Sequence, residues 1–299
     1  MRHQPSMGNR RRVGIVYNHR VPEAVRLAHE LARHLGLDKG GWLHSALDLE
    51  QMEERHPGVD VLVTVGGDGT ILRATRIAAP FEVPVLGINM GRVGFMTELG
   101  AAEALESVER YLEDQVWLEE RAMLEVEVHP RGQRQASGRS FHALNEAVVG
   151  TRGISRMVTV RATVNDVPIT DYRADAVIVA TATGSTGHAL SAGGPILHPQ
   201  SRDMVLKPVA EHLGLGAAIV LPSTSTVRLT VVSDAPAMVN VDGFMHCPLE
   251  QGDQVRVVVG RQLARFLRAG PPDRFYATMA QRLGLNRRSR ERPGTEEGA

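Results

Sequence analysis

The sequence predicts two domains: an N-terminal α/β domain built on a parallel sheet, followed by a β-rich, sandwich-like domain. Three observations support this prediction. The chain has 299 residues, which is enough for about two domains with substantial cores. Strand and helix patterns alternate up to about residue 118. From residue 121 onward, short β-branched runs separated by turn residues take their place.

The first part of the chain has the repeating pattern of a parallel sheet with helical crossovers. Unbroken apolar runs indicate strands at 12–17, 59–65 and 83–89. Apolar residues at helical spacing indicate helices at 21–36, 71–79 and 101–114. Gly36 closes the first helix as a C-cap, and Pro80 stops the second. Because each strand is followed by a helix, we expect right-handed crossovers.

The second part of the chain is rich in β-branched residues. Predicted strands lie within 123–130, 141–149, 156–164, 175–182, 217–222, 226–232, 237–243 and 255–260. A final amphipathic helix at 273–284 breaks this pattern, and we expect it to return to the first domain. The predicted units are 12–118 together with 263–285, and a β-rich domain at 119–262. We expect 1–11 and 286–299 to be disordered, since they are charged and poor in apolar residues.

Composition narrows the class of protein. Lys plus Arg and Asp plus Glu number 34 each, so no overall positive charge points to nucleic acid or to a membrane. The single cysteine, Cys247, excludes an intrachain disulfide and fits a reducing compartment. The N-terminus is basic but lacks the apolar stretch of a signal peptide. We therefore expect a soluble cytoplasmic protein.

The stretch Gly66-Gly67-Asp68-Gly69-Thr70 joins a predicted buried strand to a predicted helix. A glycine turn at a helix N-terminus directs backbone N–H groups at one point, which is typical of a phosphate site. Asp68 would repel phosphate unless a Mg²⁺ ion lies between them or the acid serves as a base. The alternative is that Asp68 only caps the helix. The local pattern leaves both interpretations open.

A second stretch, TATGSTGHALSAGGPILHP at 181–199, combines glycines with small hydroxyl residues, which suit phosphate and ribose binding. GGDGT at 66–70, LNEAVV at 144–149, YRADAVIVATATGSTGHALSAGGPILHP at 172–199 and VDG at 241–243 together resemble the motif set of the NAD kinase family. The order and spacing of these motifs are also similar. GGDGT alone is shared with lipid kinases and 6-phosphofructokinases, so the later motifs carry the specificity.

The resemblance implies transfer of a phosphoryl group from ATP, or from polyphosphate, to the 2′-hydroxyl of the adenosine ribose of NAD, with Mg²⁺ or another divalent cation. It implies that Asp68 is the general base, and it also implies a homodimer or homotetramer. The twelve histidines show no metal-ligand spacing, so no residue is assigned as a metal ligand, and the balanced charge assigns no nucleic-acid or membrane partner. A different GGDGT kinase and a non-catalytic dinucleotide-binding protein are the competing hypotheses.

The same resemblance makes 119–262 the dinucleotide-binding domain and assigns the substrate-binding residues. Asn145 and Glu146 would bind ribose hydroxyls. The remaining positions matched to dinucleotide or phosphate contacts are Gly69, Arg73, Arg156, Arg173, Asp175, Thr186, Gly187, His188, Ala189, Leu190 and Ser191. Phe95 matches an aromatic residue near the substrate, although a core phenylalanine is equally consistent with the sequence.

The chain also departs from the family pattern. Ala176 replaces a usual glycine, and Phe244 follows VDG where glutamine is frequent. Gly187-His188 replaces a common Ala-Tyr pair. His188 would either lie against the dinucleotide in place of the tyrosine or face solvent beside the loop. These departures affect recognition of the dinucleotide and leave the glycine loop with Asp68 intact.

Overall fold

The computed structural model describes residues 11–37, 40–51, 58–91, 94–113, 116–132, 138–152 and 157–284. Its N-terminal part is a parallel sheet in the order β4–β3–β1–β2. The strands are β1 (Val13–Tyr17), β2 (Trp42–Ser45), β3 (Val61–Val65) and β4 (Val85–Asn89), with the short β5 (Leu99–Gly100) beside β4. Because β3 and β4 are buried along their whole length, helices must cover both faces of this sheet.

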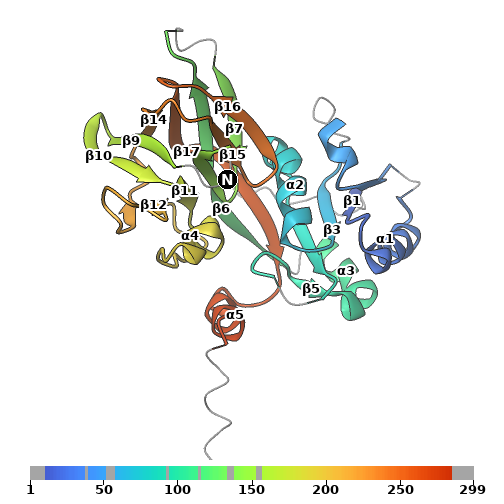
Figure 1. The fold of residues 1–299 in the computed structure, drawn as a ribbon. Helices are drawn as coiled ribbons and strands as arrows, with labels where there is room; N and C mark the ends of the chain where they lie inside the picture. Colours follow the sequence, from blue (N-terminus) through green and yellow to red (C-terminus); the bar gives the residue numbers. More distant parts are fainter. Residues whose placement is uncertain are drawn as a thin grey trace, which may run out of the picture.

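Helices cover the sheet as its apolar pattern requires. The helices α1 (Pro22–Leu35) and α3 (Ala104–Leu112) share one buried cluster with the sheet. On the opposite face, α2 (Asp68–Ala78) packs through Ile71 and Ala74 in a second cluster. In Figure 1, α2 stands between β3 and the β-rich part, whereas α1 and α3 lie on the far side. The helix that begins at Asp68 therefore faces the second half of the molecule.

The β-rich part is a sandwich of two sheets. One contains β6 (Trp117–His129), β7 (Arg139–Ala143), β9 (Val158–Val164), β10 (Val167–Ala174), β14 (Val227–Val231) and β17 (Gln254–Arg268). The other contains β8 (Glu146–Thr151), β11 (Ala176–Thr181), β12 (Met204–Val209), β13 (Ile219–Leu221), β15 (Ala237–Val241) and β16 (Met245–Leu249). A single buried cluster contains residues of both sheets. The short helix α4 (His188–Ser191) covers the outer face of the second sheet through Ala189.

The long strand β17 joins the two halves. Its first part pairs with β14 and β6 in the sandwich, and Phe266 near its end pairs with Val85 of β4. One sheet thus runs from β10 through β17 to β2. After β17 the helix α5 (Arg274–Arg282) lies at the lower edge of the molecule in Figure 1, below the β-rich half. No helix in the described part of the chain is long and apolar enough to cross a membrane.

The predicted fold class is confirmed, and so is the glycine cap at Gly36, which has φ 61°. The single predicted strand at 141–149 is wrong: a turn at Leu144 and Asn145 divides it into β7 and β8. Several strands were not predicted, namely β2, β10, β12 and β16. The disorder expected for 1–11 and 286–299 concerns, apart from Arg11, residues outside the described ranges. The predicted boundary at residue 262 falls within β17, a strand that belongs to both halves, so the domain boundaries stay predictions.

Candidate active site

The glycine loop connects β3 to α2. Gly66 has to be glycine, because a Cβ there would lie 2.4 Å from Thr70 Oγ1. Gly67 is the N-cap of α2, and a Cβ at this position would meet nothing within 4 Å. A Cβ at Gly69 would meet only Arg73 Nη1, at 3.9 Å. The backbone at Gly67 and Gly69 therefore lies open at a helix N-terminus, where it can approach an anion.

Asp68 is the first residue of α2 and does not cap it. Its Oδ1 atom is buried without a hydrogen-bond partner, close to Gly94. Any Cβ at residue 94 would overlap this carboxylate, since the two would be 2.2 Å apart. Its Oδ2 atom lies 3.7 Å from Nη2 of Arg282, on α5. The capping interpretation is thus wrong, and the side chain, 31% exposed, borders solvent with acceptor capacity unused.

The Asn145–Glu146 pair lies at the turn between β7 and β8, held by a buried carboxylate. Asp242 accepts hydrogen bonds from the backbone N–H groups of Leu144, Asn145 and Glu146, at 2.8, 2.8 and 3.0 Å. Leu144 belongs to the same buried cluster as Ile71 of α2. The turn is therefore fixed in position against the helix that carries Asp68.

Glu146 is an unusual carboxylate. Only 12% of its side chain is exposed, and Oε2 is buried without a hydrogen-bond partner. Burial, and secondly the nearby Asp242, raise the pKa of Glu146 to about 7. Burial also raises the pKa of Asp242 to about 6, against the lowering effect of its three backbone hydrogen bonds. A buried carboxyl group with unused acceptors is suited to binding a polar ligand group.

The glycine- and serine-rich segment 181–199 packs directly on this turn. Gly184 approaches the carbonyl of Asn145 so closely that a Cβ would lie 2.1 Å from it. Thr181 donates to the carbonyl of Leu144 and accepts from the N–H of Gly184. His188 has a 59% exposed side chain and an Nδ1 atom 3.9 Å from Oε1 of Glu146. The start of α4 therefore borders the carboxylate of Glu146.

The other residues of this segment differ in exposure. Gly187 and Ser191 are exposed, and Thr186 and Leu190 are half-buried. The hydroxyl of Thr186 already donates to the carbonyl of Thr183. Ala189 is fully buried in the cluster under α4, so its side chain is a core residue rather than a ligand contact.

Two of the predicted residues do not join this cluster. Arg173 lies near the end of β10 and Asp175 lies between β10 and β11, whereas Glu146 pairs with Ala180 toward the other end of β11. Ala176, next to Asp175, is four residues from Ala180, or about 13 Å along the strand. Arg156 lies outside the described residues.

Arg73 and Phe95 do border the site. Arg73 donates to the carbonyl of Gly69 and lies over the ring of Phe244, at 5.0 Å from its centroid. The ring of Phe95 is half-buried beneath the guanidinium group of Arg282, at 4.4 Å. Phe95 is therefore a residue of the site's edge rather than of the core.

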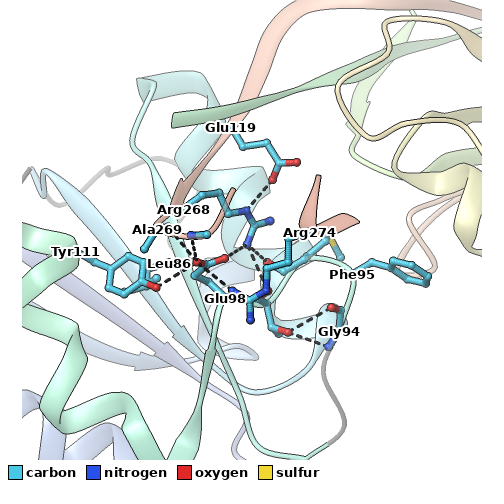
Figure 2. Close-up of polar contacts among 12 residues, drawn as sticks. Leu86, Gly94, Phe95, Glu98, Tyr111, Glu119, Arg268, Ala269 and Arg274 are labelled. Atoms are coloured by element: carbon cyan, nitrogen blue, oxygen red, sulfur yellow. Dashed lines mark hydrogen bonds and ion pairs between the residues drawn. The ribbon is translucent and has the colours of Figure 1, made fainter. Parts of the chain in front are cut away.

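A buried network of charged residues holds the loop 94–98 (Figure 2), and this loop packs on Asp68. Arg268 donates to Glu119, to Glu98 and to the carbonyls of Met96 and Thr97. Arg121 donates to Glu119 and to the carbonyl of Phe95. Burial alone would raise the pKa of Glu119, but the two arginines outweigh it and hold the pKa below its usual range. The network thus fixes the loop that packs on Asp68.

Comparison with known proteins agrees with this geometry. The family model of the ATP-NAD kinase N-terminal domain matches residues 46–116, and that of the C-terminal domain matches 144–269. The NAD kinase of Dehalococcoides mccartyi strain CBDB1 is 38% identical over 93% of this chain and 98% of its own length. That of Chloroflexus aurantiacus is 36% identical over 91% and 98%.

The chain belongs to the NAD kinase family. Solved structures agree in fold: a yeast NADH kinase complexed with NADH has a TM-score of 0.79 at 21% identity, covering 96% of this chain and 91% of its own. An NAD kinase from Archaeoglobus fulgidus in complex with ATP has a TM-score of 0.69 at 25% identity, covering 90% and 97%.

Sequence reasoning missed three residues of this NAD kinase site. Asp242 lies in the VDG motif, which was matched to the family without a role for its acid. Phe244 was recognised only as a departure. Arg282 carried no signal, since a single arginine in an amphipathic helix is ordinary, and only the fold brings it to Asp68.

Proposed function

We propose that this chain is an NAD kinase in which Asp68 is the general base. The 2′-hydroxyl of the adenosine ribose gives its proton to the Asp68 carboxylate, and its oxygen forms the new bond to phosphorus. The bond from phosphorus to the bridging oxygen of the donor breaks, and ADP or a shortened polyphosphate leaves with the electron pair. The observation that carries this proposal is the carboxylate of Asp68, held among glycines with unused acceptor capacity.

Asn145 and Glu146 are proposed to bind the ribose diol. Their backbone is fixed by Asp242, and Glu146 keeps a buried oxygen without a partner. An amide and a carboxyl group together can donate to and accept from two neighbouring hydroxyls. The open backbone at Gly67 and Gly69 suits the phosphates, so acceptor and donor would meet in front of Asp68.

A divalent cation such as Mg²⁺ is part of the proposal. Among the described residues no group of three or more His, Cys, Asp or Glu is placed to hold a metal ion. Mg²⁺ commonly binds through one or two carboxylates together with substrate phosphates and water. The carboxylate of Asp68, 31% exposed at the start of α2, fits such a minimal protein contribution. When bound, the ion neutralises charge on the donor phosphates and polarises the transferred group.

Cytoplasmic location and a homodimer or homotetramer remain proposals. They rest on the family and on the sequence. Arg173 and Asp175 lie away from Glu146, and in an oligomer such residues can serve a neighbouring subunit's site.

The deciding experiment is an NADP-formation assay with ATP and then polyphosphate as donor, on wild type and Asp68→Asn. We expect the wild type to form NADP. The Asn variant should bind NAD normally and turn over about 10²–10⁴-fold more slowly, because a general base is lost. Near-normal turnover of Asp68→Asn would exclude Asp68 as the base. Activity on a lipid or sugar phosphate alone would instead indicate another GGDGT kinase.

A further inference from the structure

The last helix, α5, bridges the two sides of the candidate site. Arg274 at its start lies 3.6 Å from Glu98, and Arg282 at its end lies 3.7 Å from Asp68. Between them, the ring of Phe275 packs against the ring of His198, which follows the GSTG segment. The two ring centroids are 5.3 Å apart. None of the residues of α5 is buried. The helix is therefore held by side-chain contacts at its surface, without a core of its own, and its end can shift at low cost.

Arg282 is held at Asp68 by two contacts. Its guanidinium group lies 4.4 Å from the centroid of the Phe95 ring, within cation–π range, while Nη2 faces Oδ2 of Asp68. The side chain remains 32% exposed. Position in the last turn of α5 also suits a cation, because the helix dipole is negative there.

Two other arginines near Asp68 are directed to other partners. Arg121 is buried with its charge directed to Glu119 and to the carbonyl of Phe95. Arg73 donates to Gly69 and lies over Phe244. Arg282 differs from both because one of its partners is the proposed base itself, at a distance longer than a hydrogen bond. A phosphate donor carries several negative charges and would compete for this guanidinium group.

We propose that Arg282 is a catalytic residue of the phosphoryl transfer: it pairs with Asp68 in the free protein and with the transferred phosphoryl group once the donor binds. The exchange releases Oδ2 of Asp68, its partner oxygen, for the ribose hydroxyl. It also places a planar cation on the oxygens that gain charge during transfer. Arg282 forms no covalent bond, and the proton passes from the hydroxyl to Asp68 as above. This inference rests on the proposed function.

The test compares Arg282→Gln, Arg282→Lys and Arg282→Ala with Gln281→Ala, an exposed neighbour on the same helix. We expect Arg282→Gln to lower kcat about 10³-fold, as for arginines that act on a transferred phosphoryl group. Arg282→Lys should keep part of the activity, and Gln281→Ala all of it. Calorimetry should show weaker binding of a non-hydrolysable ATP analogue by Arg282→Gln, with NAD affinity unchanged. Free guanidinium ion at millimolar concentration should partly restore Arg282→Ala.

The outcomes separate the two proposals. If the wild type forms no NADP from either donor, both fall. If the wild type is active and Arg282→Gln keeps turnover within threefold, only the role of Arg282 falls. A thermal melt of each variant identifies a purely structural role: equal losses of NAD and donor binding with a lowered melting temperature, and no effect of guanidinium, would overturn the proposal.

Discussion

Phe244 lies against two arginines of α2. The guanidinium carbons of Arg73 and Arg76 are 5.0 and 5.7 Å from the centroid of its ring. Phe244 follows the turn that contains Asp242, and Asp242 holds the backbone of the Asn145–Glu146 pair. The aromatic ring therefore connects the half of the candidate site that contains the proposed ribose-binding pair to the half that contains Asp68. Glutamine, frequent here in the family, cannot provide this aromatic face.

Replacing Phe244 by alanine should loosen this connection. We expect the free energy of unfolding to fall by about 1–2 kcal/mol through loss of the cation–π contacts. The KM for NAD should rise, because the ribose-binding turn is no longer held to α2. Phe244→Trp should retain both properties. Phe81→Ala, at a 52% exposed position, is the control. If Phe244→Ala matches that control in NAD kinetics, the connection has no functional role.

Asn145→Ala and Glu146→Ala should affect one substrate selectively. Both side chains belong to the proposed ribose site, away from the glycines that would receive the donor. We expect a rise in the KM for NAD of about tenfold or more, as for loss of a buried hydrogen bond to a polar group, with little change for ATP. Steady-state kinetics with each substrate varied in turn measures this. Equal rises for NAD and ATP would point to a damaged fold.

The raised pKa of Glu146 predicts a pH-dependent stability. Glu146 ionises near its ordinary value of 4.5 in the unfolded chain and at about 7 in the folded protein. The stability contributed by its neutral form is therefore complete below pH 4.5 and is lost as the pH rises to 7. Glu146→Gln keeps the group neutral, so at pH 8 we expect it to be more stable than wild type by about 1–3 kcal/mol. Urea unfolding at pH 5 and pH 8 tests this; a Gln variant with no advantage at pH 8 would show that Glu146 is ionised without cost.

Removing an arginine from the buried charge network should lower stability far more than removing one from a surface ion pair. Arg268→Met leaves Glu98 and Glu119 without their shared partner, which should cost about 3–5 kcal/mol of stability. Arg161→Met, which removes an exposed pair with Asp171, should cost about 0–1 kcal/mol. Chemical denaturation of both variants measures the contrast. A similarly small loss of stability in both variants would mean that solvent reaches the buried charge network.

Local pattern predicted the fold class but not every strand. Runs such as that of β3 are buried on both faces and read as strands without ambiguity. Strand β12 contains Lys207 and Pro208, which obscure it. Its lysine is buried only because the amine donates to the carbonyl of Gly216 at 2.7 Å, a contact that no pattern reveals. Strand β16 alternates between buried Cys247 and exposed His246 and Pro248, so its apolar content is low.

The candidate site, like the fold, could be predicted from the sequence only in part. Asp68, Asn145 and Glu146 lie in short motifs and were predicted from the sequence, and the structure places them at the candidate site. Their supports lie far away along the chain: Asp242 beneath the pair, and Arg268 beneath the loop that packs on Asp68. Such partners are brought together only by sheet order, so single-sequence reasoning had no means of pairing them.

The shared strand β17 has a consequence for how this protein is made. The parallel sheet of the N-terminal half needs Phe266 beside Val85 to be complete, and Phe266 lies far after Val85 along the chain, so it leaves the ribosome long after β4. Until then the edge of β4 beside it lacks this neighbour, in a segment of high apolar content. Completion of the first half during synthesis must therefore wait for β17, and a chain that stops before Phe266 would keep an aggregation-prone edge.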